Sequence, residues 1–202
     1  MICVGTKWQR PPVSVLAAAF FCASQFYASG ALAQSGALAE KLQLCSACHG
    51  EDGNSKLEKI PSLAGQPAFF ILNQLFLMRE GVRKVEAMAA IVKDLKDDDL
   101  TNLSQHFAAL APKRSDEAVD AALAKKGAEI AAQRRCSSCH LPSLAGQEQM
   151  PRVARQRIDY LIETLKSYRD NPRSGADTAM SPPVAGATDA DITALAHYAA
   201  SL

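Results

Sequence analysis

Two five-residue segments have the residue types and the spacing that attach an iron porphyrin to a protein. Residues 45–49 read C-S-A-C-H and residues 136–140 read C-S-S-C-H. On one helical turn the first and fourth residues share a face and the fifth lies beside them. The C-x-x-C-H pattern is the signature of covalent c-type haem attachment. It predicts two haems c, bound through the thiols of Cys45, Cys48, Cys136 and Cys139.

The histidine after each cysteine pair separates this interpretation from its competitors. Cysteine pairs alone also occur in zinc sites and in thioredoxin-like redox centres. A histidine at the fifth position, found twice, favours haem because its imidazole can bind the iron as an axial ligand. We therefore expect His49 and His140 to be axial iron ligands.

A haem that only transfers electrons has a second axial ligand on its iron. Met88 follows His49 by 39 residues and Met180 follows His140 by 40, each in a loop before a final helix, so we expect these two thioethers to be the ligands. Met78 lies in the apolar register of a helix, where core packing is its expected role. Irons that are closed on both sides offer no place for peroxide or oxygen, which argues against an enzyme.

The chain repeats itself with an offset of about 90 residues, which is the repeat signal of two similar units. Gly36 and Gly127 each lie nine residues before a motif, and Gln66 and Gln156 fall in register after it. We expect the two glycines to let the first helix of each unit approach the last helix closely. Each half is then one unit with one haem.

A proline in each half is expected to shape the loop on the histidine side of the haem. A backbone carbonyl there can accept the imidazole Nδ1–H and fix its tautomer. Pro61 lies twelve residues after His49 and Pro151 lies eleven after His140, so loop length pairs these two. Pro142 begins a copy of the Pro61 segment only two residues after His140 and remains the second choice.

Arginines also keep the register of the repeat. Arg79 and Arg169 are one pair, and Arg83 and Arg173 are another. They are expected either to pair with haem propionates or to be solvated at helix ends.

The elements that must position these residues are expected to be all helical. Apolar residues at helical spacing predict helices over 36–46, 67–79, 118–136 and 154–169, and a final helix after each methionine. Acidic residues at 97–99 and Thr188-Asp189 predict the N-terminal caps of the two final helices. No alternating strand pattern is present in the sequence.

The N-terminus reads as a secretory signal peptide over residues 1–33. Lys7 and Arg10 precede an apolar run over 13–27 and an A-L-A cleavage site at 31–33. A membrane anchor is the alternative, but the run is short and contains polar residues. Export would place the protein in the periplasm.

Composition supports this picture. Of six cysteines, Cys3 and Cys22 would leave with the signal peptide, so no thiol outside the two motifs remains for a disulfide. Of 22 basic residues, Lys7 and Arg10 would also leave, which gives 20 against 21 acidic residues and no basic surplus for nucleic acid. The expected organisation is a cytochrome c domain over 34–111, a linker over 112–117 and a second domain over 118–202.

The chain resembles the di-haem cytochrome c4 family, and each half resembles a class I cytochrome c domain. The resemblance rests on the two haem motifs, P-S-L-A-G-Q at 61–66, R-E-G-V-R at 79–83, and Met88 and Met180. It implies two tandem helical domains related by a pseudo-twofold axis, and a periplasmic carrier that takes electrons from the respiratory chain to a terminal oxidase. The second half departs from the pattern, with V-A-R-Q at 153–156 and Leu-Pro after His140.

Three functions compete at this point. The first is a diffusing electron carrier between a quinol-oxidising complex and a terminal oxidase. The second is the cytochrome subunit of a periplasmic dehydrogenase, such as a sulfide-oxidising flavoprotein. The third is a di-haem peroxidase, which requires one open iron site. The expected partners are redox proteins, with peripheral association to membrane complexes and no nucleic acid.

Overall fold

The computed structural model describes residues 36–171 and 178–202, so the expected signal peptide and Arg173 lie outside the described residues. The chain divides into two compact units, Met1–Ala39 and Glu40–Leu202, and both C-x-x-C-H motifs lie in the second. The described residues are helical, and the β-structure found among them is one isolated bridge between Gln147 and Met150. The all-α prediction is confirmed.

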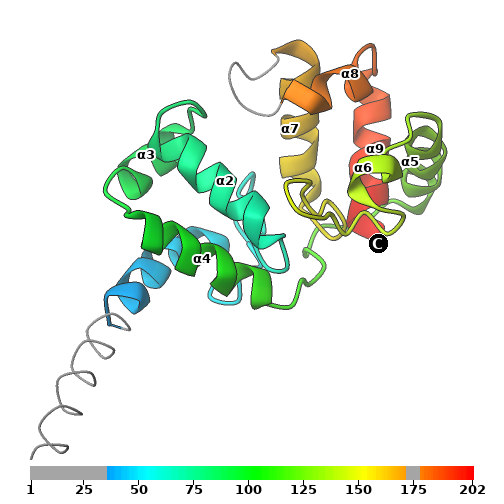
Figure 1. Cartoon of the computed structure of the whole chain (residues 1–202). Coiled ribbons are helices and arrows are strands. Elements are labelled where there is room, and N and C mark those ends of the chain that lie inside the picture. The colour runs from blue at the N-terminus through cyan, green and yellow to red at the C-terminus, as the bar shows by residue number, and fades with distance from the viewer. Residues whose placement is uncertain (1–35, 172–177) are drawn as a thin grey trace, which may run out of the picture. The chain divides into compact units, whose positions relative to one another are not determined.

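The helices follow one another in the same order in both halves (Figure 1). Their bounds are 36–49, α2 Ala68–Arg79, α3 Glu86–Val92, α4 Asp97–Ala109, α5 Ala121–Gln133, α6 Ser137–His140, α7 Ile158–Asp170, the 3-10 turn η1 Thr178–Met180, α8 Ser181–Val184 and α9 Asp189–Ser201. Helix α2 packs against α3 and α4, while α9 packs against α5 and α7. Helices α2 and α4 therefore correspond to α7 and α9.

The two final helices begin where acidic residues can satisfy their free N–H groups. At α9, Thr188 Oγ1 accepts the Asp191 N–H at 3.1 Å, and Asp191 accepts the Thr188 N–H at 3.0 Å. At α4 the carboxylate of Asp99 accepts the backbone N–H of Lys96 at 2.9 Å. Lys96, rather than an aspartate, is thus the residue before α4, and the predicted acidic cap acts from inside the first turn.

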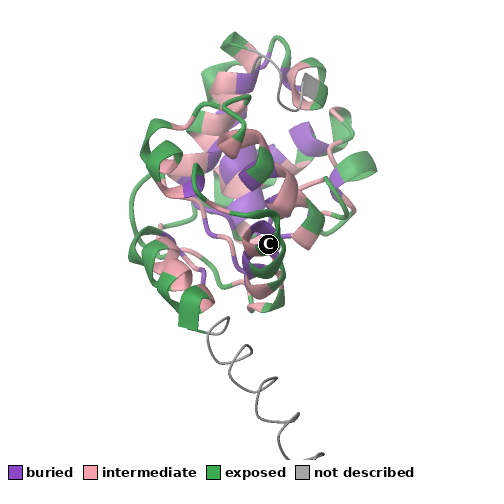
Figure 2. Cartoon of the chain, turned by 60° about the vertical axis from the view of Figure 1, so that its left-hand side comes forward, coloured by how far each residue is buried: buried purple, intermediate pink, exposed green. Residues whose placement is uncertain are grey.

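The core of the second half is closed by the crossing of α5 and α9. A methyl group on Gly127 would overlap the carbonyl oxygen of Ala194, and Ala194 itself is fully buried. The predicted close approach is therefore confirmed for Gly127, and it stays a prediction for Gly36, which belongs to the unit Met1–Ala39. Buried residues line the inward faces of the helices (Figure 2).

Two predicted helices are shorter than expected. Helix α5 ends at Gln133, not at residue 136, because Arg135 turns to a φ of +56°. The N–H of Arg135 then bonds to Ala132 and that of Cys136 to Ala131, which is the bond pattern of a Schellman helix end. The second haem motif therefore starts a helix of its own, whereas the first lies at the end of the helix over 36–49.

Helix α7 begins at Ile158, not at residue 154, because its cap comes from far away in the chain. The carboxylate of Glu117 accepts the N–H groups of Ile158 and Asp159 at 2.7 and 2.9 Å. The guanidinium of Arg157 lies beside them, 3 % exposed and 3.9 Å from Glu117. The segment expected to be a linker is thus held to the second half by its acidic end.

No helix within residues 36–171 and 178–202 has the length and apolar character needed to cross a bilayer.

Candidate haem sites

Each motif histidine is held by the carbonyl of a proline. The Nδ1–H of His49 donates to the carbonyl oxygen of Pro61 at 2.8 Å, and the Nδ1–H of His140 donates to that of Pro151 at 2.8 Å. Because a carbonyl only accepts, the neutral ring carries its proton on Nδ1 and leaves Nε2 free to bind a metal. Pro151, and not Pro142, is therefore the counterpart of Pro61.

The two loops share an unusual backbone angle at two corresponding positions although their sequences differ. The residues after the two histidines, Gly50 and Leu141, have φ values of +86° and +68°. Farther along, Gly65 and Arg155 have +64° and +59°. Leucine and arginine rarely adopt these angles, so the surrounding bonds must hold them there. The departures seen in the second half therefore leave the bond between histidine and proline unchanged.

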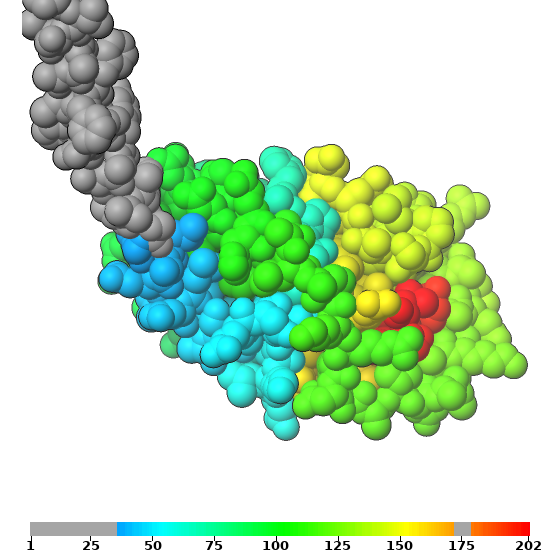
Figure 3. Space-filling view, turned by 90° about the horizontal axis from the view of Figure 1, so that it is seen from below, coloured from blue at the N-terminus to red at the C-terminus, as the bar shows by residue number. Residues whose placement is uncertain are grey.

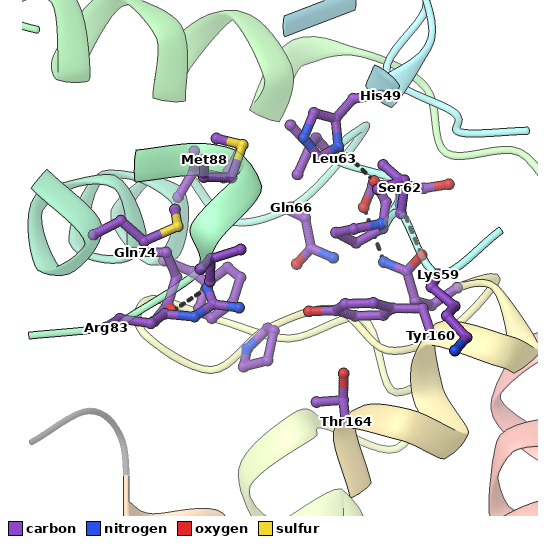
Figure 4. A pocket seen from close by; sticks show the side chains of 18 of the residues that line it. His49, Lys59, Ser62, Leu63, Gln66, Gln74, Arg83, Met88, Tyr160 and Thr164 are labelled. Carbon is purple, nitrogen blue, oxygen red and sulfur yellow. Dashed lines mark hydrogen bonds between the residues drawn. The ribbon is translucent and has the colours of Figure 1, made fainter. Parts of the chain in front are cut away.

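The loops open onto one cavity of about 270 Å³ that takes its walls from both halves of the chain. Eight of the predicted haem-site residues line it, and so does Arg152, which was not predicted. The first half contributes Cys45, Cys48, His49, Pro61 and Met88, and the second contributes His140, Pro151, Met180 and Arg152. Figure 4 shows Met88 across the cavity from His49. Leucine, isoleucine, valine and aromatic side chains make up more than half of the remaining lining residues, which suits the apolar faces of a porphyrin.

The axial pair is most complete in the second half. The Sδ atom of Met180 lies 3.5 Å from His140 Nε2, the nitrogen that the Pro151 bond leaves free. Met180 is the last residue of η1, before the short helix α8. Met88 lies inside helix α3 and not in a loop, which corrects its predicted position. Met78 also lines the cavity in the first half, so it is not the simple core residue that its helical register indicated.

The thiols differ in their surroundings. Burial raises the pKa of the Cys45 and Cys136 thiols, whereas Cys48 and Cys139 are exposed. All four are free of disulfides. Cys136 packs against the core of the second half, and neither it nor Cys139 is among the described residues that line the cavity. One half-buried and one exposed thiol per motif fit a ring that is partly enclosed by the protein.

Arg79 and Arg169, expected either to pair with propionates or to be solvated at helix ends, bond to groups of the protein itself. Arg79 bonds to the Leu95 carbonyl and to Asp97 at 3.0 and 2.8 Å. Arg169 bonds to the carbonyl of Ala187 at 2.9 Å and to Asp189 at 2.7 Å. Arg79 therefore ties α2 to the start of α4, and Arg169 ties α7 to the start of α9. Neither lines the cavity within the described ranges.

Two other arginines do face the cavity, and each has a buried Nε without an acceptor among the described residues. Arg83 donates to Gln74 at 2.6 Å through Nη1. Arg152 is 5 % exposed and donates to the carbonyls of Ala64 and Ala154. Burial and the charge of Arg155 lower the pKa of Arg152 to about 10. A buried guanidinium without a carboxylate fits a site completed by an anionic group such as a haem propionate.

Sequence reasoning missed Arg152 because its repeat partner is Ser62, a residue without charge. The signal that could have found it is the repeat itself. The position that directly follows each loop proline, 62 or 152, lines the cavity, and an arginine there is buried.

The halves meet at these same loops. The buried amide of Gln66 bonds to both backbone groups of Arg152, and the buried amide of Gln156 bonds to both backbone groups of Ser62, at 2.8 to 2.9 Å. Positions 62 and 152 correspond in the repeat, as do 66 and 156, so the contact is reciprocal. Figure 3 shows the cyan segments of the first half in contact with the yellow segments of the second.

Comparisons with known proteins agree with this arrangement. The family model for cytochrome c matches residues 124–202. Cytochrome c4 of Pseudomonas aeruginosa is 31% identical over 169 residues, which cover 78% of this chain and 83% of that protein. The chain belongs to the cytochrome c4 family. The crystal structure of reduced recombinant cytochrome c4 from Pseudomonas stutzeri has a TM-score of 0.75 and 30% identity, and the match covers 83% of this chain and 97% of that one.

A further relative of this cytochrome c4 chain has a more specific name. The thiosulfate dehydrogenase electron acceptor of Thiomonas intermedia is 29% identical over 168 residues, which cover 78% of this chain and 77% of that protein. As a member of the cytochrome c4 family, the chain has the fold of two tandem class I cytochrome c domains. It binds two covalent haems c and is an electron-transfer protein rather than an enzyme.

Proposed function

We propose that each motif and its methionine hold one haem. The first haem is bound by the thiols of Cys45 and Cys48 and ligated by His49 and Met88. The second haem is bound by the thiols of Cys136 and Cys139 and ligated by His140 and Met180. The observation that carries this assignment is the facing pair of His140 Nε2 and Met180 Sδ at 3.5 Å, with the ring fixed by Pro151.

Each haem, when bound, supplies a one-electron couple between ferric and ferrous iron. The protein's part is to keep both ligands in place in both oxidation states. The proline carbonyls fix the imidazoles, and the soft methionine thioether favours the ferrous state and raises the reduction potential. Arg83 and Arg152 would hold propionates, because their buried Nε atoms face the shared cavity.

We further propose the organisation that these sites require. Residues 1–33 are a cleaved signal peptide, 34–111 and 118–202 are the two haem domains, and 112–117 connect them. The protein then acts in the periplasm. N-terminal sequencing of the periplasmic protein should begin at Gln34, and a start at Met1 would contradict the proposal.

The proposed role is to carry electrons from a quinol-oxidising complex to a terminal acceptor such as a cytochrome oxidase. The second candidate is a partner of a dehydrogenase, which the relative named as a thiosulfate dehydrogenase electron acceptor favours. Both roles use the same two haem sites and differ only in the donor.

The purified two-haem protein can decide between these donors. Stopped-flow absorbance should follow its reduction by a membrane quinol-oxidising complex and, separately, by thiosulfate dehydrogenase with thiosulfate. Faster reduction by the quinol-oxidising complex supports the respiratory carrier, and faster reduction by the dehydrogenase supports the second role. Two results would refute the site assignment itself. One is a haem content below two per chain, and the other is cyanide binding by the untreated ferric protein at the rate typical of an iron with an open site.

A further inference from the structure

One peptide group in each half connects the iron-binding histidine to the other half of the chain. In the peptide between Pro61 and Ser62, the C=O accepts the Nδ1–H of His49 at 2.8 Å. The N–H of the same peptide donates to Gln156 Oε1, also at 2.8 Å. These bonds are among the dashed lines beside Ser62 in Figure 4. A single planar group therefore joins an imidazole on one side to an amide of the opposite half on the other.

The second half has the same arrangement with the partners exchanged. The peptide between Pro151 and Arg152 accepts from His140 Nδ1–H at 2.8 Å and donates to Gln66 Oε1 at 2.9 Å. The connection thus runs both ways, and each glutamine acts on the histidine that is not its own.

The orientation of both amides is fixed by their second bonds. Gln156 Nε2 donates to the carbonyl of Ser62 at 2.9 Å, and Gln66 Nε2 donates to the carbonyl of Arg152 at 2.8 Å. Only one assignment of oxygen and nitrogen places a donor opposite each acceptor. Gln66 and Gln156 are 4 % and 2 % exposed, so water does not compete for these bonds.

Hydrogen bonds in series strengthen one another. An N–H that donates to a good acceptor polarises its peptide, which places more negative charge on the C=O. The carbonyl then accepts the imidazole N–H more strongly, and the ring gains imidazolate character and becomes a stronger ligand. A more basic axial ligand favours ferric iron and lowers the reduction potential.

We infer that Gln156 and Gln66 are positioning residues that tune the ligand strength of His49 and His140, each from the opposite half of the chain. This inference rests on the proposed assignment of these histidines as iron ligands. The contact between the halves is then part of the ligand field of both irons as well as a packing surface.

The two connections are unequal. Gln156 Oε1 also accepts the N–H of Arg157 at 3.0 Å, so its acceptor strength is divided between two donors. The residue after Gln66 is Pro67, which has no N–H to offer. Gln66 Oε1 therefore accepts only the Arg152 N–H among the bonds of the described residues. Loss of Gln66 should shift the reduction potential of the haem at His140 more than loss of Gln156 shifts that of the haem at His49.

The test is to replace each glutamine by leucine and to titrate both haems by their visible spectra. Gln156→Leu should raise the potential of the first haem and leave the second unchanged, and Gln66→Leu should do the reverse with the larger shift. In the ferrous proteins the Nδ1–H resonance of the affected histidine, in a ¹⁵N-labelled sample, should move upfield because its hydrogen bond weakens.

The sign of the shift separates this effect from a simple loosening of the contact. Water that enters a loosened site stabilises the charged ferric form, so both potentials would fall. A fall of both potentials, no shift, or a shift of the haem in the mutated half itself would each overturn the inference. The two leucine variants are independent tests, so one that fails to fold still leaves the other.

The matched control is Gln156→Glu. A glutamate in either protonation state keeps an oxygen that can accept the Ser62 N–H, so the upward shift of the first haem should not occur. The wild-type spectrum separates a failure of the proposed sites from a failure of the tuning by the glutamines. If it shows no histidine–methionine ligation, the proposed sites are wrong; if it does and the variants leave the potentials unchanged, only the tuning by the glutamines is wrong.

Discussion

The thioether of Met180 faces the imidazole of His140, with Sδ 3.5 Å from Nε2, although 40 residues separate them in the chain. We expect Met180→Ala to lower the potential of the second haem by at least about 0.1 V, within the roughly 0.8 V that axial ligands span. The absorbance of the ferric iron–methionine bond should fall by half in a redox titration. An unchanged absorbance would remove Met180 from the ligand set.

In the first half two methionines line the cavity, so the ligand there needs a direct comparison. Met88→Ala should abolish the other half of the iron–methionine absorbance, because Met88 is the repeat partner of Met180. Met78→Ala should leave that absorbance intact. It should lower the free energy of unfolding by less than about 2 kcal/mol, the lower end for a fully buried methionine, since Met78 is only half-buried. The reverse result, measured on the same spectra, would make Met78 the ligand.

The arginines give a prediction about the two roles that the sequence pattern left open, pairing with propionates or solvation at helix ends. Arg152→Gln should lower a haem potential, because a positive charge next to a propionate favours the ferrous state. Arg169→Gln should leave both potentials unchanged and slightly reduce thermal stability, since Arg169 joins α7 to Asp189 at the start of α9. Potentiometric titration of the two variants side by side checks this, and a shift in Arg169→Gln alone would restore the propionate role predicted from the repeat.

The crossing of α5 and α9 predicts a strong effect of one methyl group. Gly127→Ala should lower the free energy of unfolding by about 1–3 kcal/mol or more, because the new Cβ would overlap the backbone of Ala194. Its repeat partner is the control. Gly36→Ala should stay within about 0.5 kcal/mol of the wild type in denaturant unfolding, since Gly36 is exposed at the first described turn of its helix. Equal effects of the two changes would show that the helices do not cross as described.

Asp159 predicts a pH dependence of stability. Burial alone would raise its pKa, but bonds from Arg157 and from the N–H groups of Lys59 and Tyr160 outweigh burial and hold the pKa below its ordinary value. The stability that Asp159 contributes is therefore complete above about pH 4, the unfolded pKa, and is lost as the pH falls through the folded one.

The matching substitution is Asp159→Asn. It should lower the free energy of unfolding by about 1–2 kcal/mol at pH 7 and by less at pH 3, measured by denaturant unfolding at both pH values. Asp94→Asn is the control, because Asp94 is highly exposed and lies 3.9 Å from the single lysine it pairs with. A loss that is the same at both pH values would show that the carboxylate of Asp159 does not act through its charge.

Much of the site follows from spacing along the chain. The C-x-x-C-H turns, the Met88 and Met180 pair and the choice of Pro151 depend on local geometry and on comparison of the two halves. Comparison of the two halves also identified Gln66 and Gln156 as corresponding positions of the repeat, although it did not predict which groups they bond to. Gly127 could be predicted for the same reason, since its place before the motif repeats.

The remainder depends on contacts that the sequence does not contain. Arg135 ends α5 in a conformation normally left to glycine, so no glycine marks that helix end. The cap of α7 comes from Glu117, 41 residues before the residue that it caps. Leu141 holds a φ of +68° and a ψ of 162°, where the pattern of the first half has glycine. The cap of α7 is a long-range contact, and Arg135 and Leu141 adopt backbone angles that their residue types do not predict.

Gln66 bonds to Arg152 and Gln156 bonds to Ser62, so each position contacts the repeat partner of its own neighbour. Such a reciprocal contact has the symmetry of an isologous dimer. Two copies of a single-haem domain with a loop Gln could form this contact with no connecting peptide. Fusion of two such copies would keep every bond and would replace a meeting of two molecules by an event within one, so that the pairing of the two haems no longer depends on protein concentration.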